Sequence, residues 1–382
     1  MSKYVGVFTI ILLLPLVVFG AVFGSKSLLH VQTASTLDPG RLDFRSNVRF
    51  YTKVGDFLGS SKPANFQAVN YWDVQGNALL TVGIVKHFDA TVMVRGYQDT
   101  HQSNENNTPD DIFVDLKAGN LTLKDTRFNF GGIFSMRFPS GDKHNYPFEA
   151  YTAGATEFGF MGIFSYYNDP FLPDRDFSLH VNAGWYYHND AGKVLFQTPT
   201  KTFKAGNNAS EFQYGLAFSY PTELFNLNLE WWGIAFINKP DSMAFSRENF
   251  SYITPSIVFK PRNWIDFNLG VDIRVSTDTD QSARLVRFKQ KSGTGGLDLP
   301  NYSSWKVTVG TSVTLSRGTQ TLSSGYTGKG AVQRRTDFFE NLLKEKEKSR
   351  KIEDELRRLR KKREQAEKEL EELRQLLEEQ GK

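Results

Sequence analysis

The chain has 382 residues and a formal net charge of only +4, a balance too mild to indicate nucleic-acid binding. It contains no cysteine, which excludes a disulfide framework and a lipidated N-terminal cysteine. Its 32 Phe, 15 Tyr and 6 Trp lie mostly before residue 338, and the residues after that point are dense in Glu, Lys and Arg. Two segments of different composition are therefore joined in one polypeptide.

The N-terminus has the pattern of a secretory signal peptide. Lys3 precedes an apolar block at 5–19, and small residues such as Gly20 and Gly24 follow it. The block is shorter than the roughly 20 apolar residues that a transmembrane helix needs. We therefore predict that residues 1–24 are a signal peptide that directs export.

Twelve stretches of the aromatic-rich part alternate apolar and polar side chains. This period of two is that of a β-strand with one apolar and one polar face. In the clearest stretch, 264–276, Ile265 and Phe267 share one face while Asp266 and Asn268 share the other. We predict strands at about 42–54, 79–88, 89–100, 111–123, 126–140, 156–168, 177–190, 209–221, 224–236, 250–261, 264–276 and 305–316.

Short and long connections alternate between these strands. The long ones are predicted at 55–78, 101–110, 141–155, 191–208, 237–249 and 277–304. The pattern predicts an all-β transmembrane fold, namely a closed antiparallel up-and-down outer-membrane β-barrel of about twelve strands, with ten or fourteen as alternatives. A soluble β-sandwich also alternates, but it does not account for the signal peptide and the aromatic strand ends. Pro255 removes a ladder donor, which predicts a bulge or a shifted boundary in the tenth strand.

The polar faces of the strands are predicted to line the lumen. A charge on the lipid face would cost roughly 2 to 4 kcal/mol at mid-bilayer, and the apolar faces of the clearest strands carry none. Inward charges set solute selectivity or pair across strands, and Tyr186 is expected to narrow the lumen. The predicted lumen-lining residues are Arg45, Arg49, Arg95, Asp115, Lys117, Arg127, Arg137, Glu230, Asp266, Asp272, Arg274 and Lys306.

Two short motifs invite a catalytic interpretation. Ser178 and His180 share a strand face, as in a Ser-His hydrolase, and His188 and Asp190 have the same spacing. A catalytic site needs a nucleophile, a base and an orienting group within mutual reach, and no third member is evident. The histidines show no metal-ligand spacing, and no phosphate loop or dinucleotide motif is present. We therefore predict no enzyme activity, no metal and no cofactor.

The C-terminal part has a different pattern. Residues 317–336 are rich in Gly, Ser and Thr and are predicted to be a flexible linker, and 337–382 are predicted to be a charged helix or coiled coil. Glu345, Ser349 and Arg363 also fall on heptad core positions, so a lone charged helix is the alternative. The predicted coiled-coil core is Ile352, Leu356, Leu359, Leu370, Leu373 and Leu377.

Three segments resemble the outer-membrane transporters of the phenol-degradation meta-pathway type. They are VGIVKHFDATVMV at 82–94, DLKAGNLT at 115–122 and RFPSGD at 137–142, and the likeness covers about 75–275. The chain departs from that family at Asp110-Asp111, where the family has a Gly-Asp step, and in its C-terminal helix. The resemblance implies a barrel that passes small, often hydrophobic or aromatic compounds, and it supplies no site residues.

The leading hypothesis from the sequence is a porin-like channel for small solutes in the cell outer membrane, with the C-terminal helix in the periplasm. Outer-membrane lipid and a small-molecule solute are the expected partners, and nucleic acid is not. The C-terminal helix is expected to bind further copies of the chain or a periplasmic partner. The alternative hypothesis is a structural anchor, in which the barrel holds this helix as a tether.

Overall fold

The structure is a computed structural model that describes residues 26–54, 70–100, 111–122, 127–141, 144–145, 149–170, 173, 176–222, 224–277, 279, 281–283, 302–317, 350 and 355–367. The predicted signal peptide and most of the predicted linker lie outside these ranges. The chain divides into two units, Met1–Ser324 and Gly325–Lys382, and each is described by itself.

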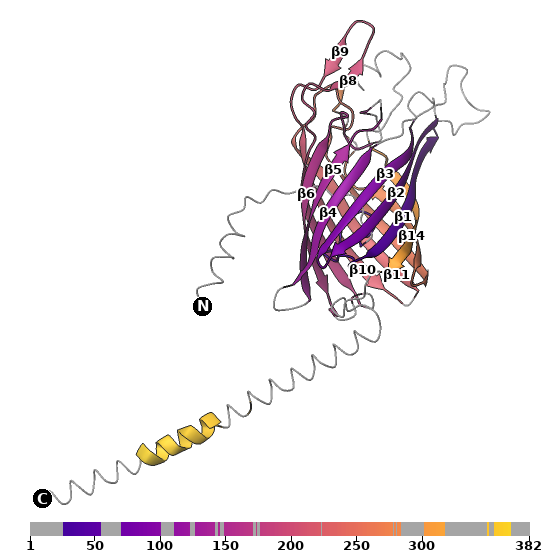
Figure 1. The fold of residues 1–382 in the computed structure, drawn as a ribbon. Coiled ribbons are helices and arrows are strands. Elements are labelled where there is room, and N and C mark those ends of the chain that lie inside the picture. The colour runs from indigo at the N-terminus through magenta and orange to yellow at the C-terminus, as the bar shows by residue number, and fades with distance from the viewer. Residues whose placement is uncertain are drawn as a thin grey trace, which may run out of the picture. The chain divides into compact units, whose positions relative to one another are not determined.

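The first unit contains fourteen strands among its described residues (Figure 1). They are β1 (Arg41–Val54), β2 (Asn70–Val85), β3 (Phe88–Thr100), β4 (Ile112–Thr122), β5 (Phe128–Phe138), β6 (Glu157–Tyr167), β7 (Ser178–Tyr187), β8 (Val194–Gln197), β9 (Thr202–Lys204), β10 (Ser210–Pro221), β11 (Phe225–Asn238), β12 (Phe250–Arg262), β13 (Ile265–Arg274) and β14 (Trp305–Arg317).

Twelve of these strands form a closed antiparallel barrel, which confirms the predicted fold. Each strand pairs with the next one along the chain, and β1 pairs with β14 to close the wall, from Arg41 opposite Arg317 to Phe50 opposite Val307. Closure leaves no unpaired sheet edge. The two remaining strands, β8 and β9, form a separate hairpin that projects beyond the barrel (Figure 1).

Short connections gather at one end of the barrel, the turn end, and long ones at the other, the loop end. The predicted alternation is therefore present, with two differences. β2 begins at Asn70, so residues 70–78 of the predicted loop 55–78 belong to a strand, and the predicted loop 191–208 contains β8 and β9. In that hairpin Phe196 stacks on Phe203 with ring centroids 4.4 Å apart.

The wall separates apolar from polar side chains as predicted. Along β11, Leu227, Leu229 and Trp231 are about half exposed, at 47%, 51% and 47%, whereas Asn228 and Glu230 between them are buried. Large exposed apolar side chains of this kind recur on the other barrel strands. A protein surface this apolar is stable where it contacts lipid rather than water.

Replacing Leu229 with lysine is expected to destabilise the barrel in lipid vesicles by roughly 2 to 4 kcal/mol, because the charge would enter hydrocarbon. Val194→Lys is the matched control, since Val194 is 48% exposed but belongs to the projecting hairpin. Denaturant titration of both variants in vesicles measures the two free energies of unfolding. Equal and small losses would show that Leu229 faces water.

Pro255 lies inside β12 without a bulge, so that prediction was wrong. The pairing of β12 with β13 keeps one register from Tyr252 opposite Arg274 to Ser256 opposite Gly270, and it skips Thr254 and Pro255. Proline lacks the N–H that a ladder bond needs, so the ladder is interrupted while the strand continues. The register between these two strands shifts further along, between Phe259 and Arg262.

In the second unit, residues 355–367 form a helix whose side chains are all exposed. Within the ranges that the structure describes, no helix has both the length and the hydropathy to cross a membrane. Of the predicted coiled-coil core, only Leu356 and Leu359 lie in this helix, and the other four leucine and isoleucine positions fall outside the described residues.

Candidate functional site

Residues 26–40, which we call the luminal segment, run inside the barrel ahead of β1. Val31 and Ala34 are fully buried there, and the polar contacts of the segment follow the order of the strands round the barrel. These contacts join Leu37 to Asp89 of β3, Ala34 to Ser165 of β6, Gln32 to Asn182 of β7, residues 29–31 to Glu230 of β11, His30 to Asp272 of β13, and Ser27 to Arg45 of β1. The segment therefore passes round the inner wall and narrows the lumen, which the sequence analysis did not predict.

Inward-facing glycines make room for this segment. A Cβ atom at Gly83 would overlap the carbonyl oxygen of Asp38, and one at Gly119 would overlap that of Ala34. Only glycine lets the strand backbone and the segment backbone approach so closely. Next to Gly119, Asn120 adopts a left-handed φ of 54° and donates its backbone N–H to Ala34 O at 2.7 Å. Glycines on the polar face were the signal in the sequence that something packs against the inner wall.

Glu230 holds the centre of the luminal segment. Its carboxylate accepts the backbone N–H groups of Leu29 at 3.0 Å and of His30 and Val31 at 2.7 Å each. The side chain is fully buried, and a buried carboxylate is stable only when its oxygens are compensated. The geometry thus assigns Glu230 a binding role toward the chain's own backbone.

Asn182 imitates a strand partner for the next part of the segment. Its Oδ1 accepts the N–H of Gln32 at 2.6 Å, and its Nδ2 donates to the carbonyl of Gln32 at 2.8 Å. One side chain therefore satisfies both backbone groups of a buried residue. An unpaired backbone group inside a protein is costly, so such pairing fixes the position of the segment.

The Ser178–His180 pair supports the luminal segment through Ser165. Ser165 Oγ accepts the N–H of Ala34 at 2.8 Å and shares a hydrogen bond with His180 Nδ1, also at 2.8 Å. His180 Nε2 shares a second hydrogen bond with Ser178 Oγ at 3.0 Å. His180 therefore links the hydroxyl that holds Ala34 to Ser178 of its own strand.

His30 connects the segment to the wall on the side of β11 to β13. Its ring stacks on Trp232 with centroids 3.9 Å apart, and its Nε2 lies 2.7 Å from Asp272 Oδ1. Its Nδ1 lies 3.5 Å from a guanidinium nitrogen of Arg49, which only donates, so Nδ1 is the acceptor and Nε2 carries the proton. Thr254 Oγ1 donates to the same Asp272 oxygen at 2.8 Å.

The predicted lumen-lining residues fall into several groups. Arg45, Arg49, Glu230 and Asp272 contact the luminal segment, and Lys306 pairs with Asp73 at 3.0 Å. Arg95 and Arg137 lie over the Phe113 ring at 5.1 and 5.3 Å. Asp115 and Lys117 are buried on β4, and Asp266 is partly buried on β13. Arg274 donates a hydrogen bond to Tyr302 O at 2.6 Å. Arg127 is exposed and lies one residue before β5.

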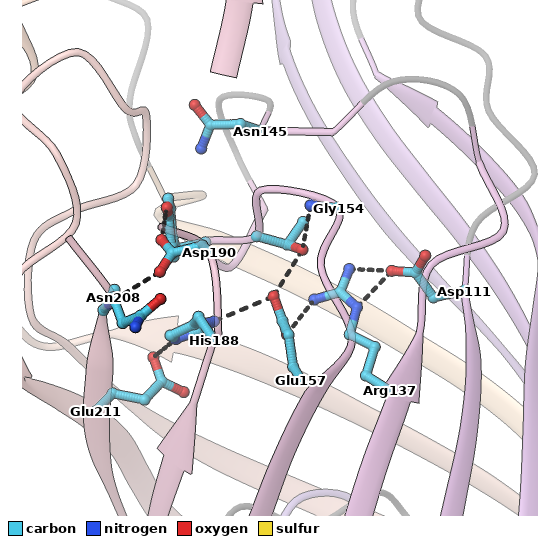
Figure 2. Close-up of polar contacts among 12 residues, drawn as sticks. Asp111, Arg137, Asn145, Gly154, Glu157, His188, Asp190, Asn208 and Glu211 are labelled. Carbon is cyan, nitrogen blue, oxygen red and sulfur yellow. Dashed lines mark hydrogen bonds and ion pairs between the residues drawn. The ribbon is translucent and has the colours of Figure 1, made fainter. Parts of the chain in front are cut away.

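Towards the loop end, buried charges form a chain that we call the outer cluster, made of Asp111, Arg137, Glu157, His188 and Glu211 (Figure 2). Arg137 lies between Asp111, with which it forms a close ion pair, and Glu157 at 3.4 Å. His188 lies between two carboxylates: its Nδ1 is 3.2 Å from Glu157 Oε1, and its Nε2 is 3.6 Å from Glu211 Oε2. Burial raises the pKa of the Asp111 carboxyl, but Arg137 outweighs this and holds that pKa below its usual value. The cluster joins β5, β6 and β10 to the loops.

His188 and Asp190, which have the i, i+2 spacing noted in the sequence, bind different partners. Asp190 accepts the hydroxyl of Tyr151 and the backbone N–H of Ala209, the latter at 2.8 Å. Above it the loops pack into an apolar core that includes Tyr151, Phe236 and Tyr302. Tyr302 donates to the carbonyl oxygens of Ser246 and Glu248, which ties two loops together.

A cavity of about 200 Å³, which we call the chamber, is lined by the luminal segment, the loops and the inner wall. His30 and Trp232 contribute from the segment side, and Tyr151 contributes from the loops. Phe113, Tyr186 and Phe250 add aromatic surface, and Glu211 adds a carboxylate. Glu211 Oε1 accepts from Gln213 at 2.6 Å, while no described residue donates a hydrogen bond to its other oxygen. Tyr186, which was expected to narrow the lumen, thus forms part of the chamber wall.

Comparisons with known proteins yield solved structures only. No protein-family model matches the chain, and neither does any curated protein. The chain is similar to an outer-membrane channel from Pseudomonas putida F1 (8% identity, 77% of this chain and 100% of that one, TM-score 0.49). It is also similar to the NanC porin (11% identity, 72% and 100%, TM-score 0.43) and the KdgM porin (8% identity, 72% and 99%, TM-score 0.36). The likeness concerns the barrel fold, and the predicted transporter family stays a prediction.

The outer cluster gives the loop end a pH-dependent stability. Burial lowers the pKa of His188, but Glu157 and Glu211 outweigh it and raise the pKa to about 10 from 6.5. A raised pKa means that the ion pairs stabilise the fold fully below pH 6.5 and are lost as the pH rises towards 10. We expect the midpoint of thermal unfolding in detergent to fall between pH 6.5 and 10.

The matched control for this prediction is His188→Gln, which keeps a polar side chain without the titrating charge. The variant should unfold at a lower temperature than the parent at pH 6.5 and show a flatter profile up to pH 10. Parallel profiles for the two proteins would mean that other groups cause the fall.

The cavities and clusters also bear on cofactors. In the part of the chain that the structure describes, no three His, Asp or Glu side chains are grouped as a metal site. Several buried charges pair with one another or hold backbone groups, as in the outer cluster and at Glu230. Asn182, Ser165 and Asp89 were not singled out from the sequence, because uncharged or isolated inward residues look alike until the luminal segment is placed against them.

Proposed function

We propose that the protein is an outer-membrane channel for the passive passage of small solutes. The observation that carries the proposal is a closed barrel with an apolar outer face and a charged, polar interior that encloses a cavity. Both ends of the barrel chain, Arg41 and Arg317, lie at the turn end. Short turns face the periplasm in outer-membrane barrels, so the C-terminal helix would belong to the periplasm.

The luminal segment is the constriction of this channel. It is held by single side chains from several strands and lacks the continuous ladder that holds the wall together. Each of these contacts is a separate hydrogen bond with a modest net contribution to stability. Solute passage would therefore depend on displacing the segment, while the wall stays closed.

The chamber supports a preference for small solutes that carry one aromatic ring. Its volume of about 200 Å³ exceeds the roughly 150 Å³ of an apolar cavity that holds benzene. Phe113, Tyr186 and Trp232 offer ring surfaces. The Glu211 carboxylate, which also faces His188 at 3.6 Å, is an acceptor for a solute hydroxyl or amine. Few polar groups among aromatic walls are typical of sites for such compounds.

The experiment that tests the channel uses the purified full chain in planar bilayers and in swelling vesicles. We expect single-channel currents and faster swelling with phenol-sized solutes than with disaccharides. A variant without the luminal segment serves as the second measurement, since a firmly seated segment would keep the full chain closed. No current and no swelling from either protein would overturn the proposal.

The second candidate function is a structural anchor, which the exposed charged helix at 355–367 favours. Deleting residues 338–382 separates the two candidates. A channel keeps its conductance after the deletion. If conductance is unchanged but envelope integrity is lost, the anchor is supported.

A further inference from the structure

The helix at 355–367 exposes apolar side chains that no described residue of its own unit covers. Leu356 is 51% exposed and Leu359 is 62% exposed, and the two lie three residues apart on one face. Continuing that face by alternate steps of four and three residues reaches Arg363 and Ala366. This is the spacing of the inner positions of a coiled coil. A helix of this length gains most of its stability from packing, so the face needs an occupant.

The charges beside this face are complementary to the same helix in a second copy. Each heptad of a coiled coil has two inner positions, here for example Leu356 and Leu359. In a parallel, in-register pair, the residue just before the first inner position faces the residue five places later on the partner helix. Glu355 would face Arg360 of the second copy, and Lys362 would face Glu367. The sequence repeats the relation on both sides, with Lys348 before Glu353 and Glu369 before Arg374. All four pairs join opposite charges.

Arg363 is the one charged residue at an inner position of the described helix. Within the single chain its Nε lies 2.8 Å from Glu367 Oε1, one turn further on, and both side chains are largely exposed. A long arginine side chain can keep its charged end at the edge of a seam while its stem contributes apolar contact. Arginine at this position is therefore compatible with association.

We propose that residues 355–367 form a parallel, in-register coiled coil with the same helix of a second copy of this chain. Charge alone also permits an antiparallel pair. The parallel choice rests on the proposed function, because copies of a barrel inserted in the same way into one membrane leave the membrane on the same side and enter this helix from its N-terminal end. The association links neighbouring barrels through their C-terminal units.

Single cysteines test the register, because the chain contains none of its own. Leu356→Cys and Ala366→Cys are made separately in the full chain, and Lys361→Cys on the opposite helix face is the control. In a parallel pair each inner cysteine meets its counterpart within the roughly 4.4 to 6.8 Å between Cα atoms that a disulfide needs. An antiparallel pair brings like residues together only at its midpoint.

Mild oxidation of the full chain in detergent and in native membranes should give a covalent dimer with both inner variants and several-fold less with the control. A dimer from only one inner variant would overturn the parallel register. Equal yields from all three, or none, would overturn the coiled coil. Planar-bilayer currents from the same preparations report separately on the channel, so failure of the association and failure of the proposed function are distinguished.

Charge reversal tests whether the pairs specify the association. In the Leu356→Cys background, Glu355→Arg places like charges opposite Arg360 of the second copy and should lower the dimer yield several-fold. Adding Arg360→Glu restores opposite charges and should restore the yield. An unchanged yield with the single reversal, or no recovery with the double one, would contradict charge pairing between the two helices.

Discussion

A variant that lacks residues 27–36 should conduct ions several-fold better than the full chain in planar bilayers. The luminal segment touches the wall from β3 round to β1, so its removal widens the lumen. Residues 37–40 stay in place, because Gly40 donates to Gly83 O at 2.7 Å and leads into β1. Glu230, Asn182 and Asp272 would then be solvated by water in the wider lumen.

The matched control removes a similar length from the projecting hairpin, residues 195–203. That deletion leaves all twelve barrel strands intact, because β8 and β9 pair only with each other. The control should conduct like the full chain. Equal conductance of the two deletions, with both proteins folded, would show that the luminal segment does not limit the pore.

Replacing Glu230 with alanine should release the luminal segment without shortening the chain. The substitution leaves the N–H groups of Leu29, His30 and Val31 without an acceptor, and each such buried donor costs roughly 1 to 3 kcal/mol. We expect the rate at which a thiol reagent reaches the segment to rise by at least about tenfold, because 1.4 kcal/mol corresponds to a factor of ten. Thiol labelling of Val31→Cys measures it, since Val31 is fully buried.

Two further variants sharpen this prediction. Glu230→Gln keeps one acceptor oxygen of the same shape, so its labelling rate should fall between those of glutamate and alanine. Glu248→Ala is the control, since Glu248 is buried and accepts a backbone N–H from Gln281 in the loops rather than from the segment. Labelling that rises equally with Glu248→Ala would mean that the barrel loosens as a whole.

The wall of the barrel was predictable because its pattern is local. At 264–276 and 225–231 each side chain faces outward or inward according to its parity, and the sequence shows the alternation directly. The prediction failed where the contrast is weak. At the start of β2, Asp73, Gln75 and Asn77 alternate with Val74, Gly76 and Ala78, so neither face is strongly apolar. The strands β8 and β9 are too short to show a period.

The chemistry of the interior was predicted only as a set of inward charges. Glu230 and Asp272 are buried, and they bind the luminal segment, which is distant in the sequence. The segment itself has no alternation, and its neighbours on the wall include Gly83 and Gly119, whose role depends on what they leave room for. The same holds for His188, whose partners Glu157 and Glu211 come from different strands.

By itself the sequence determined a closed wall of about twelve strands and the side of each strand that faces outward, since these follow from the period of two between neighbouring residues. Only the tertiary structure decided that residues 26–40 narrow the lumen and that a chamber lies beside them. The physical reason is that interior packing joins residues far apart in the chain, and hydrogen bonds such as those of Glu230 have no period that a sequence can display.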